Sequence, residues 1–143
     1  MRVSFIGRGP EAHTARTTLV QRTHLLSMER PGTGSVWSEA IHATDLTVLT
    51  TTDDGWPDHE GLEGAVAAIL DVASFKSRRH GILFIGPLDG ADLEALRRRE
   101  DLCWYAHTDA LGAPVHCDDL EGQRALERLL GIATQGVRIA VAA

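Results

Sequence analysis

Two short segments that are apolar along nearly their whole length constrain this chain more than any other feature. They are residues 45–51, DLTVLTT, and residues 81–85, GILFI. Strands that are buried on both faces of a sheet have such runs, whereas strands with one face in water alternate. A polar or glycine-containing loop and then a helical pattern follow each segment. This alternation predicts an α/β fold with a mainly parallel sheet.

The other segments extend the alternation over a single domain, residues 1–143. Further strands are expected at residues 3–6, 102–107 and 113–117, with an extra strand or apolar tail within 134–143. Helices are expected at residues 15–26, 35–41, 62–75, 89–100 and 118–130. The first should open on Arg16-Thr17-Thr18, and Asp89 or Asp92 should cap the fourth. We therefore predict a three-layer α/β/α sandwich with a sheet of about five strands.

Composition excludes several classes of protein. The chain has 143 residues, of which 43% are hydrophobic and 24% charged, as in a globular domain with a core. Its net charge of -6 argues against a nucleic-acid partner. No apolar run approaches the ~20 residues that span a bilayer, so no membrane partner is expected. The chain enters a strand without a signal-peptide pattern, which favours a cytoplasmic location.

In open parallel sheets, ligands bind at the carboxyl ends of the strands. The loops that fall there are residues 7–14, 52–61, 86–90 and 116–119. The first of them contains Gly7-Arg8-Gly9-Pro10 and lies between a strand and a helix. In that layout, loop N–H groups and the helix dipole favour a bound phosphate.

The second half of the chain carries a family resemblance. The run AILDVASFKSRRHGILFIGPLDGADLEALRRRE, followed by APVHCDDLEGQRALERLL, resembles the EutP/PduV proteins of ethanolamine and propanediol utilisation. The resemblance is specific mainly over residues 62–130. It implies a P-loop NTPase fold, a GTPase-like protein, and an association with a bacterial microcompartment.

The resemblance also assigns candidate nucleotide contacts. Residues 7–18 fall on the phosphate-binding loop, residues 29–32 on the D-x-P-G motif, and residues 86–89 on the guanine motif [NST]-K-x-D. The candidate binding residues are therefore Gly7, Gly9, Arg16, Thr17, Thr18, Glu29, Gly32 and Asp89. For Thr17, Thr18 and Asp89, an ordinary helix-capping role is the alternative.

Departures from the family pattern argue that GTP hydrolysis has been lost. A working loop reads G-x-x-x-x-G-K-[ST], but this one reads GRGPEAHTARTT, with Arg16 in place of the lysine. Pro10 removes a backbone donor, and Glu11 brings a negative charge to the phosphate position. Pro87 replaces the lysine of the guanine motif, and Glu29 replaces the aspartate of the second motif.

Three hypotheses follow. The leading one is a degenerate GTPase-like accessory protein with no required cofactor, which acts through a protein partner or as a homo-oligomer. The second is an active enzyme that binds GTP or ATP with Mg²⁺ through a non-standard loop, using Arg16 and Thr17. The third is a Rossmann-like domain that binds a metabolite at the same strand ends.

Other constellations predict little chemistry. Cys103, His107, His116 and Cys117 offer soft and imidazole ligands, but their spacing matches no common zinc motif. We predict no metal site, and we interpret the two cysteines as reduced, small buried residues. Trp56 is a candidate partner contact, and Trp104-Tyr105 are expected in the core. No serine or cysteine has the local setting of a nucleophile, so no catalytic residue is predicted.

Overall fold

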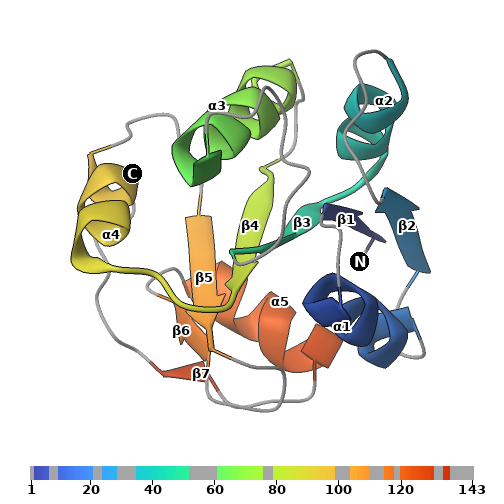
Figure 1. Cartoon of the computed structure of the whole chain (residues 1–143). Helices are drawn as coiled ribbons and strands as arrows, with labels where there is room; N and C mark the ends of the chain where they lie inside the picture. The colour runs from blue at the N-terminus through green and yellow to red at the C-terminus, as the bar shows by residue number, and fades with distance from the viewer. Residues whose placement is uncertain are drawn as a thin grey trace.

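The computed structural model describes residues 2–6, 10–20, 24–28, 35–51, 61–75, 79–98, 104–109, 115–117, 120–130 and 134–135 (Figure 1). Within these residues the elements in chain order are β1 Arg2–Ile6, α1 Pro10–Val20, β2 His24–Met28, α2 Ser35–Ala43, β3 Leu46–Thr50, α3 Gly61–Ala73, β4 Gly81–Ile85, α4 Gly90–Arg97, β5 Trp104–Thr108, β6 Val115–Cys117, α5 Leu120–Leu130 and β7 Thr134–Gln135. The expected strand or tail at the end of the chain lies largely outside them, since only the short β7 is described there.

The strands form one sheet in the order β2-β1-β3-β4-β5-β6-β7. The first five strands of this order run parallel to one another, β6 is antiparallel to β5, and β7 is parallel to β6. The predicted α/β fold with a mainly parallel sheet is confirmed. Because β6 runs in the opposite direction, it ends at the amino edge of the parallel strands. The expectation that residues 116–119 join the ligand loops was therefore wrong for its described part, His116–Cys117.

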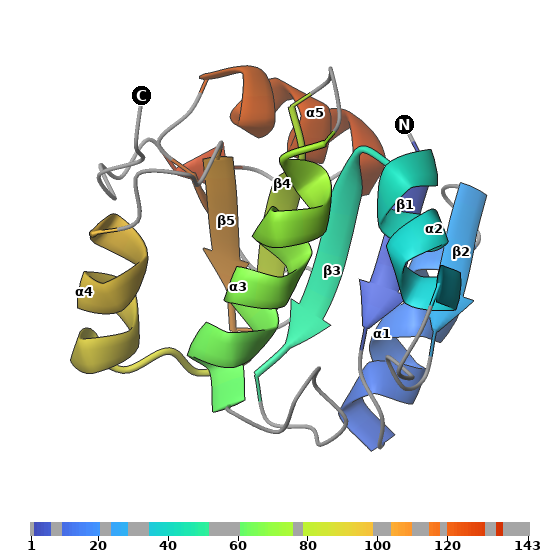
Figure 2. The same cartoon turned by 90° about the horizontal axis from the view of Figure 1, so that it is seen from above.

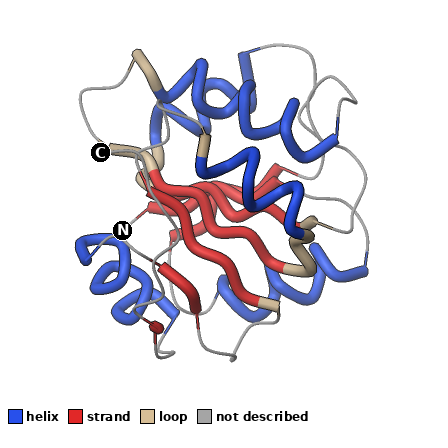
Figure 3. Tube along the Cα trace, turned by 90° about the vertical axis from the view of Figure 1, so that its left-hand side faces the viewer, coloured by secondary structure: helices blue, strands red, loops and turns tan. Residues whose placement is uncertain are grey.

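Helices cover both faces of the sheet. Helices α1 and α5 lie on one face, and α2, α3 and α4 lie on the other (Figures 2 and 3). Two buried apolar clusters match this division. One joins Val3, Phe5, Val48 and Leu83 of the strands to Leu19 of α1 and Leu126 of α5. The other joins Leu49, Ile82, Phe84 and Tyr105 to Ile41, Ile69 and Leu96 of the remaining helices. Tyr105 is fully buried, as expected for the core.

The first helix differs from its prediction in both position and length. Helix α1 starts at Pro10 and ends at Val20, so the predicted start at Arg16 and the range 15–26 were wrong. Proline suits the first position of a helix, because its N–H would have no partner there and its φ is already helical. Residues 24–28 form β2, which pairs in parallel with β1 and was not predicted.

A chain of hydroxyl groups and one imidazole is buried at the amino ends of the central strands. Thr47 Oγ1 lies 2.8 Å from Ser4 Oγ and 2.7 Å from His80 Nε2, and Thr44 Oγ1 donates to Ser4 Oγ at 3.2 Å. All four residues are at most 1% exposed. Buried polar groups of this kind are tolerated because they satisfy one another. This cluster lies at the edge opposite the carboxyl ends of the strands.

Among the helices that the structure describes, none combines the length and the apolar character that a membrane crossing requires.

Candidate functional site

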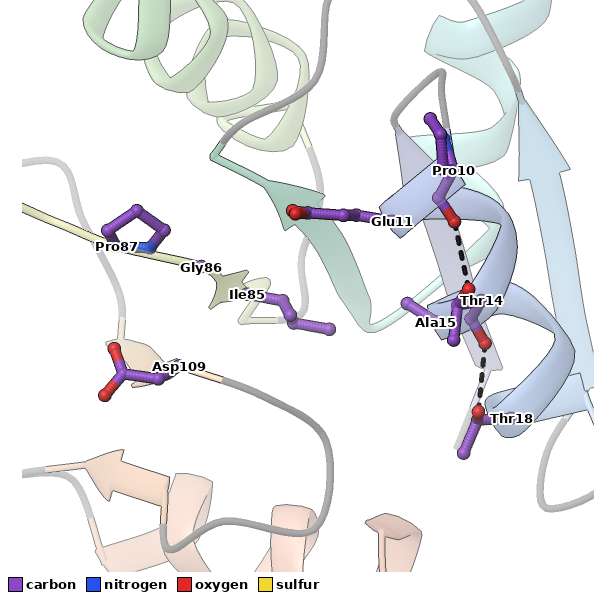
Figure 4. Close-up of a pocket in the computed structure, with 9 residues that line it drawn as sticks. All are labelled: Pro10, Glu11, Thr14, Ala15, Thr18, Ile85, Gly86, Pro87 and Asp109. Carbon is purple, nitrogen blue, oxygen red and sulfur yellow. Dashed lines mark hydrogen bonds between the residues drawn. The ribbon is translucent and has the colours of Figure 1, made fainter.

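The described residues enclose a pocket of about 480 Å³ at the carboxyl edge of the parallel strands. Its walls come from one face of α1, from the end of β4 with the two residues after it, and from the residue after β5 (Figure 4). The lining residues are Pro10, Glu11, Thr14, Ala15, Thr18, Ile85, Gly86, Pro87 and Asp109. In the sheet, β2 lies on one side of β1 and β3 lies on the other. Open α/β sheets bind ligands near such a change in the order of strands. Of the loops predicted to bind a ligand, residues 7–14 and 86–90 contribute lining residues to this pocket.

One stripe of α1 faces the pocket. Its members are Glu11, Thr14, Ala15 and Thr18, which have the i, i+3, i+4, i+7 spacing of a single helix face. The side chain of Glu11 points from α1 across the pocket toward Ile85 and Gly86 (Figure 4). Arg16 is not on this stripe and does not line the pocket.

The threonine hydroxyls of α1 donate within the helix. Thr14 Oγ1 donates to the Pro10 carbonyl at 3.0 Å, Thr17 Oγ1 to His13 at 2.9 Å, and Thr18 Oγ1 to Thr14 at 2.9 Å. Such bonds to the preceding turn are typical of threonine inside a helix. Thr17 lies seven residues after Pro10, about 10 Å along the helix axis, so the expected position at the helix start was wrong.

The end of β4 forms the opposite wall. Gly86 has φ 117°, and its N–H donates to the Thr108 carbonyl at 3.0 Å. A Cβ atom on Gly86 would overlap the Oγ1 of Thr51, whose own N–H donates to Ile85 at 2.9 Å. Glycine is required here because the positive φ and the close approach of Thr51 both exclude a side chain.

His107 supports the same wall from the other face of the sheet. Its Nε2 lies 2.6 Å from the Gly86 carbonyl oxygen and 3.6 Å from Asp109 Oδ1. A carbonyl oxygen only accepts, so Nε2 is the protonated nitrogen. The carboxylate of Asp109 is 85% exposed, and Figure 4 shows it turned away from α1. His107 therefore fixes the Gly86 peptide, and Asp109 lies at the rim of the pocket.

The predicted binding residues are only partly brought together. Of the eight, Thr18 lines the pocket, while Arg16, Thr17 and Asp89 are described but do not line it. Gly7, Gly9, Glu29 and Gly32 lie outside the described residues, as does Trp56. Sequence reasoning did not select Thr14, Ala15, Ile85 or Asp109. The signal for the first two was Pro10 as a helix start, which would have revealed the stripe.

Asp89 caps α4, which was one of the two roles expected for it. Its side chain accepts from the Asp92 N–H at 2.8 Å, and the Asp92 side chain accepts from the Asp89 N–H at 3.4 Å. This reciprocal pair satisfies two N–H groups at the helix start.

Substitution of Asp89 tests its capping role. Asp89→Ala is expected to lower the free energy of unfolding by about 1 kcal/mol, and Asp89→Asn to change it by less than about 0.5 kcal/mol, because asparagine also caps helices. Urea unfolding followed by circular dichroism measures both. A loss of stability in Asp89→Asn as large as in Asp89→Ala would show that the carboxylate does more than cap α4.

The cysteine and histidine constellation is divided between the two faces of the sheet. His107 and His116 are register partners on β5 and β6, and their rings stack with centroids 6.4 Å apart. Cys117 follows His116 in the strand, points to the opposite face and is buried in the cluster with Leu83 and Ala106. No group of three or more metal-ligating side chains is found among the described residues, which do not include Cys103.

Comparisons with known proteins do not assign the chain to a family. No family model matches it, and no curated protein does either. Among solved structures, the capsular polysaccharide assembling protein CapF from Staphylococcus aureus is similar with a TM-score of 0.48 and 15% sequence identity. The alignment covers 94% of this chain and 32% of CapF, so the chain spans about a third of that protein's length. Similarity at this level carries no argument about function.

Proposed function

We propose that this chain is a degenerate GTPase-like protein that has lost GTP hydrolysis and acts as a binding or accessory protein through its carboxyl-edge pocket. The proposal includes the finer description of the fold as a three-layer, P-loop-like sandwich and the EutP/PduV relationship, with its microcompartment association, which rests on sequence resemblance. The observation that carries the proposal is the chemistry of the α1 start. Pro10 and Glu11 are the first two residues of α1, and the side chain of Glu11 points into the pocket.

A triphosphate would meet unfavourable groups at this position. Phosphate sites at helix starts depend on N–H donors and a cation, but Pro10 has no N–H and Glu11 is an acid in the first turn. The hydroxyl of Thr18 is already a donor to Thr14. A triphosphate at this position would lack the cationic contact and several N–H donors. The loss in binding or transition-state stabilisation is on the order of several kcal/mol, because the missing contacts are charge-assisted hydrogen bonds.

Calorimetric titration tests this proposal. We expect no measurable binding of GTP, GDP or ATP at concentrations up to about 1 mM, with or without Mg²⁺, because the pocket opposes a phosphate with a carboxylate. Glu11→Gln serves as a control, since removing the charge should raise nucleotide affinity slightly, if at all. Micromolar binding that disappears in Arg16→Ala and Asp89→Ala would instead support an active nucleotide-binding enzyme.

The pocket itself favours an alternative function, that of the Rossmann-like metabolite-binding domain given above as the third hypothesis. Its volume of about 480 Å³ falls within the range of small-molecule sites, and its position is the ligand edge of the sheet. A thermal-shift screen with neutral and charged metabolites distinguishes the candidates. Stabilisation by a non-nucleotide compound, with no response to GTP, favours a metabolite site over a purely protein-binding accessory role.

A further inference from the structure

The polar groups that line the pocket are hydrogen-bond acceptors. Glu11 contributes a carboxylate, and the hydroxyl protons of Thr14 and Thr18 are already donated to the Pro10 and Thr14 carbonyls at 3.0 and 2.9 Å. What these two hydroxyls still offer to the pocket is oxygen lone pairs. These described side chains therefore favour a ligand that donates hydrogen bonds to them.

Part of the backbone among the described lining residues offers no donor to the pocket. Pro10 and Pro87 have no N–H, and the N–H of Gly86 donates to the Thr108 carbonyl at 3.0 Å. The Ile85 N–H belongs to a strand that is paired on both sides.

Apolar surface makes up much of the remaining wall. Pro10, Ala15, Ile85 and Pro87 contribute aliphatic carbon from the two opposing sides, α1 and the end of β4 (Figure 4). Asp109 adds a second negative charge at the rim, although its carboxylate is directed toward His107. The pocket thus combines an apolar body with a carboxylate that reaches into it.

We infer that this pocket binds a small ligand with an apolar body and a cationic, donor-bearing head such as an amidinium, guanidinium or ammonium group. The head donates to the carboxylate of Glu11, and the body packs between Ala15 and Ile85. A carboxylate accepts up to about four hydrogen bonds, so Glu11 binds a ligand donor in addition to its contact within the chain. The inference rests on the proposed role of the pocket as the ligand site.

Three probes of nearly identical shape test the inference. Benzamidinium carries a cationic donor head, benzamide a neutral head and benzoate an anionic acceptor head, all on the same phenyl ring. We expect benzamidinium to bind at least about tenfold more tightly than either of the others, measured by ligand-observed NMR titration up to about 10 mM. Glu11→Gln should reduce benzamidinium affinity about tenfold and benzamide affinity much less, because glutamine still accepts a hydrogen bond and only the ion pair with the cationic head is lost. Glu39→Gln, the same change at an exposed position on α2 outside the pocket, is the control and should leave benzamidinium affinity unchanged.

Several outcomes would overturn the inference. These are equal binding of the three probes, tighter binding of benzoate, no benzamidinium binding at about 10 mM, and unchanged benzamidinium binding in Glu11→Gln. Parallel titration with GTP and Mg²⁺ separates this failure from that of the proposed function. GTP binding would contradict the proposed function. If GTP does not bind and the three probes bind equally, only the inferred class of ligand is contradicted.

Discussion

Replacing Gly86 with alanine is expected to lower the free energy of unfolding by about 2 to 4 kcal/mol. Its φ of 117° lies in a region that residues with a Cβ atom rarely adopt. The new methyl group would also overlap Thr51 Oγ1, and the Thr51 backbone is held by its N–H bond to the Ile85 carbonyl at 2.9 Å. Urea unfolding followed by circular dichroism gives the difference directly.

Gly90→Ala is the matched control. Gly90 is the first residue of α4, and a Cβ atom there has no neighbour within 4 Å among the described contacts. Alanine is the better helix former, so this variant should be unchanged or up to about 1 kcal/mol more stable. Equal effects of Gly86→Ala and Gly90→Ala would contradict the role of the positive φ at Gly86.

A further variant separates the two causes at Gly86. Thr51 Oγ1 is buried and has no hydrogen-bond partner among the described residues. Thr51→Ala removes both this group and the atom that the new methyl would meet. If steric overlap dominates, Gly86→Ala should cost less in the Thr51→Ala background than in the parent chain. If the positive φ dominates, its cost should be the same in both.

The most strongly patterned elements could be predicted from the sequence. The apolar runs at residues 45–51 and 81–85 are the central strands β3 and β4, and Asp89 caps the helix that follows β4. Both strand segments are nearly continuously apolar and are bounded by polar or glycine-containing residues, so local pattern and tertiary structure agree. The paired strands β1, β5 and β6 were also expected, with boundaries displaced by one or two residues.

The start of the chain was harder to interpret because two patterns overlap. The helical spacing of apolar residues continues through Leu19, Val20 and Leu26. In the structure the helix ends at Val20, and residues 24–28 form the strand β2. Pro10 was interpreted as part of the loop that follows the first strand, but it is the first residue of α1. A short apolar segment of five residues cannot be distinguished from a helix by periodicity alone.

The site could be placed at an edge of the sheet but not resolved into its residues. The rule that ligands bind at the carboxyl ends of parallel strands locates Gly86 and Pro87 correctly. Asp109 was missed because the loop after the strand predicted at residues 102–107 was not counted among the carboxyl-edge loops. The direction of β6 also depends on tertiary pairing, which a three-residue segment does not encode.

Replacing Thr47 with valine is expected to lower the free energy of unfolding by about 1 to 3 kcal/mol. Valine has nearly the shape of threonine, but it removes the hydroxyl that lies 2.8 Å from Ser4 Oγ and 2.7 Å from His80 Nε2. Two buried hydrogen bonds are then lost, at about 0.5 to 1.5 kcal/mol each, while Ser4 keeps its bond with Thr44. The measurement is again urea unfolding, with a double-mutant cycle between Thr47→Val and Ser4→Ala to isolate the shared bond.

Thr17→Val is the control for the same chemical change at an exposed position. Thr17 is exposed on α1, and its hydroxyl donates to the His13 carbonyl at 2.9 Å, a group that water can also satisfy. Its removal should change stability by less than about 0.5 kcal/mol. Similar effects at Thr47 and Thr17 would mean that the buried hydroxyl chain adds nothing beyond ordinary threonine packing. A large loss of stability only at Thr47, with coupling to Ser4, would show that polar contacts contribute to the stability of this sheet. These contacts lie at the edge opposite the carboxyl-edge pocket.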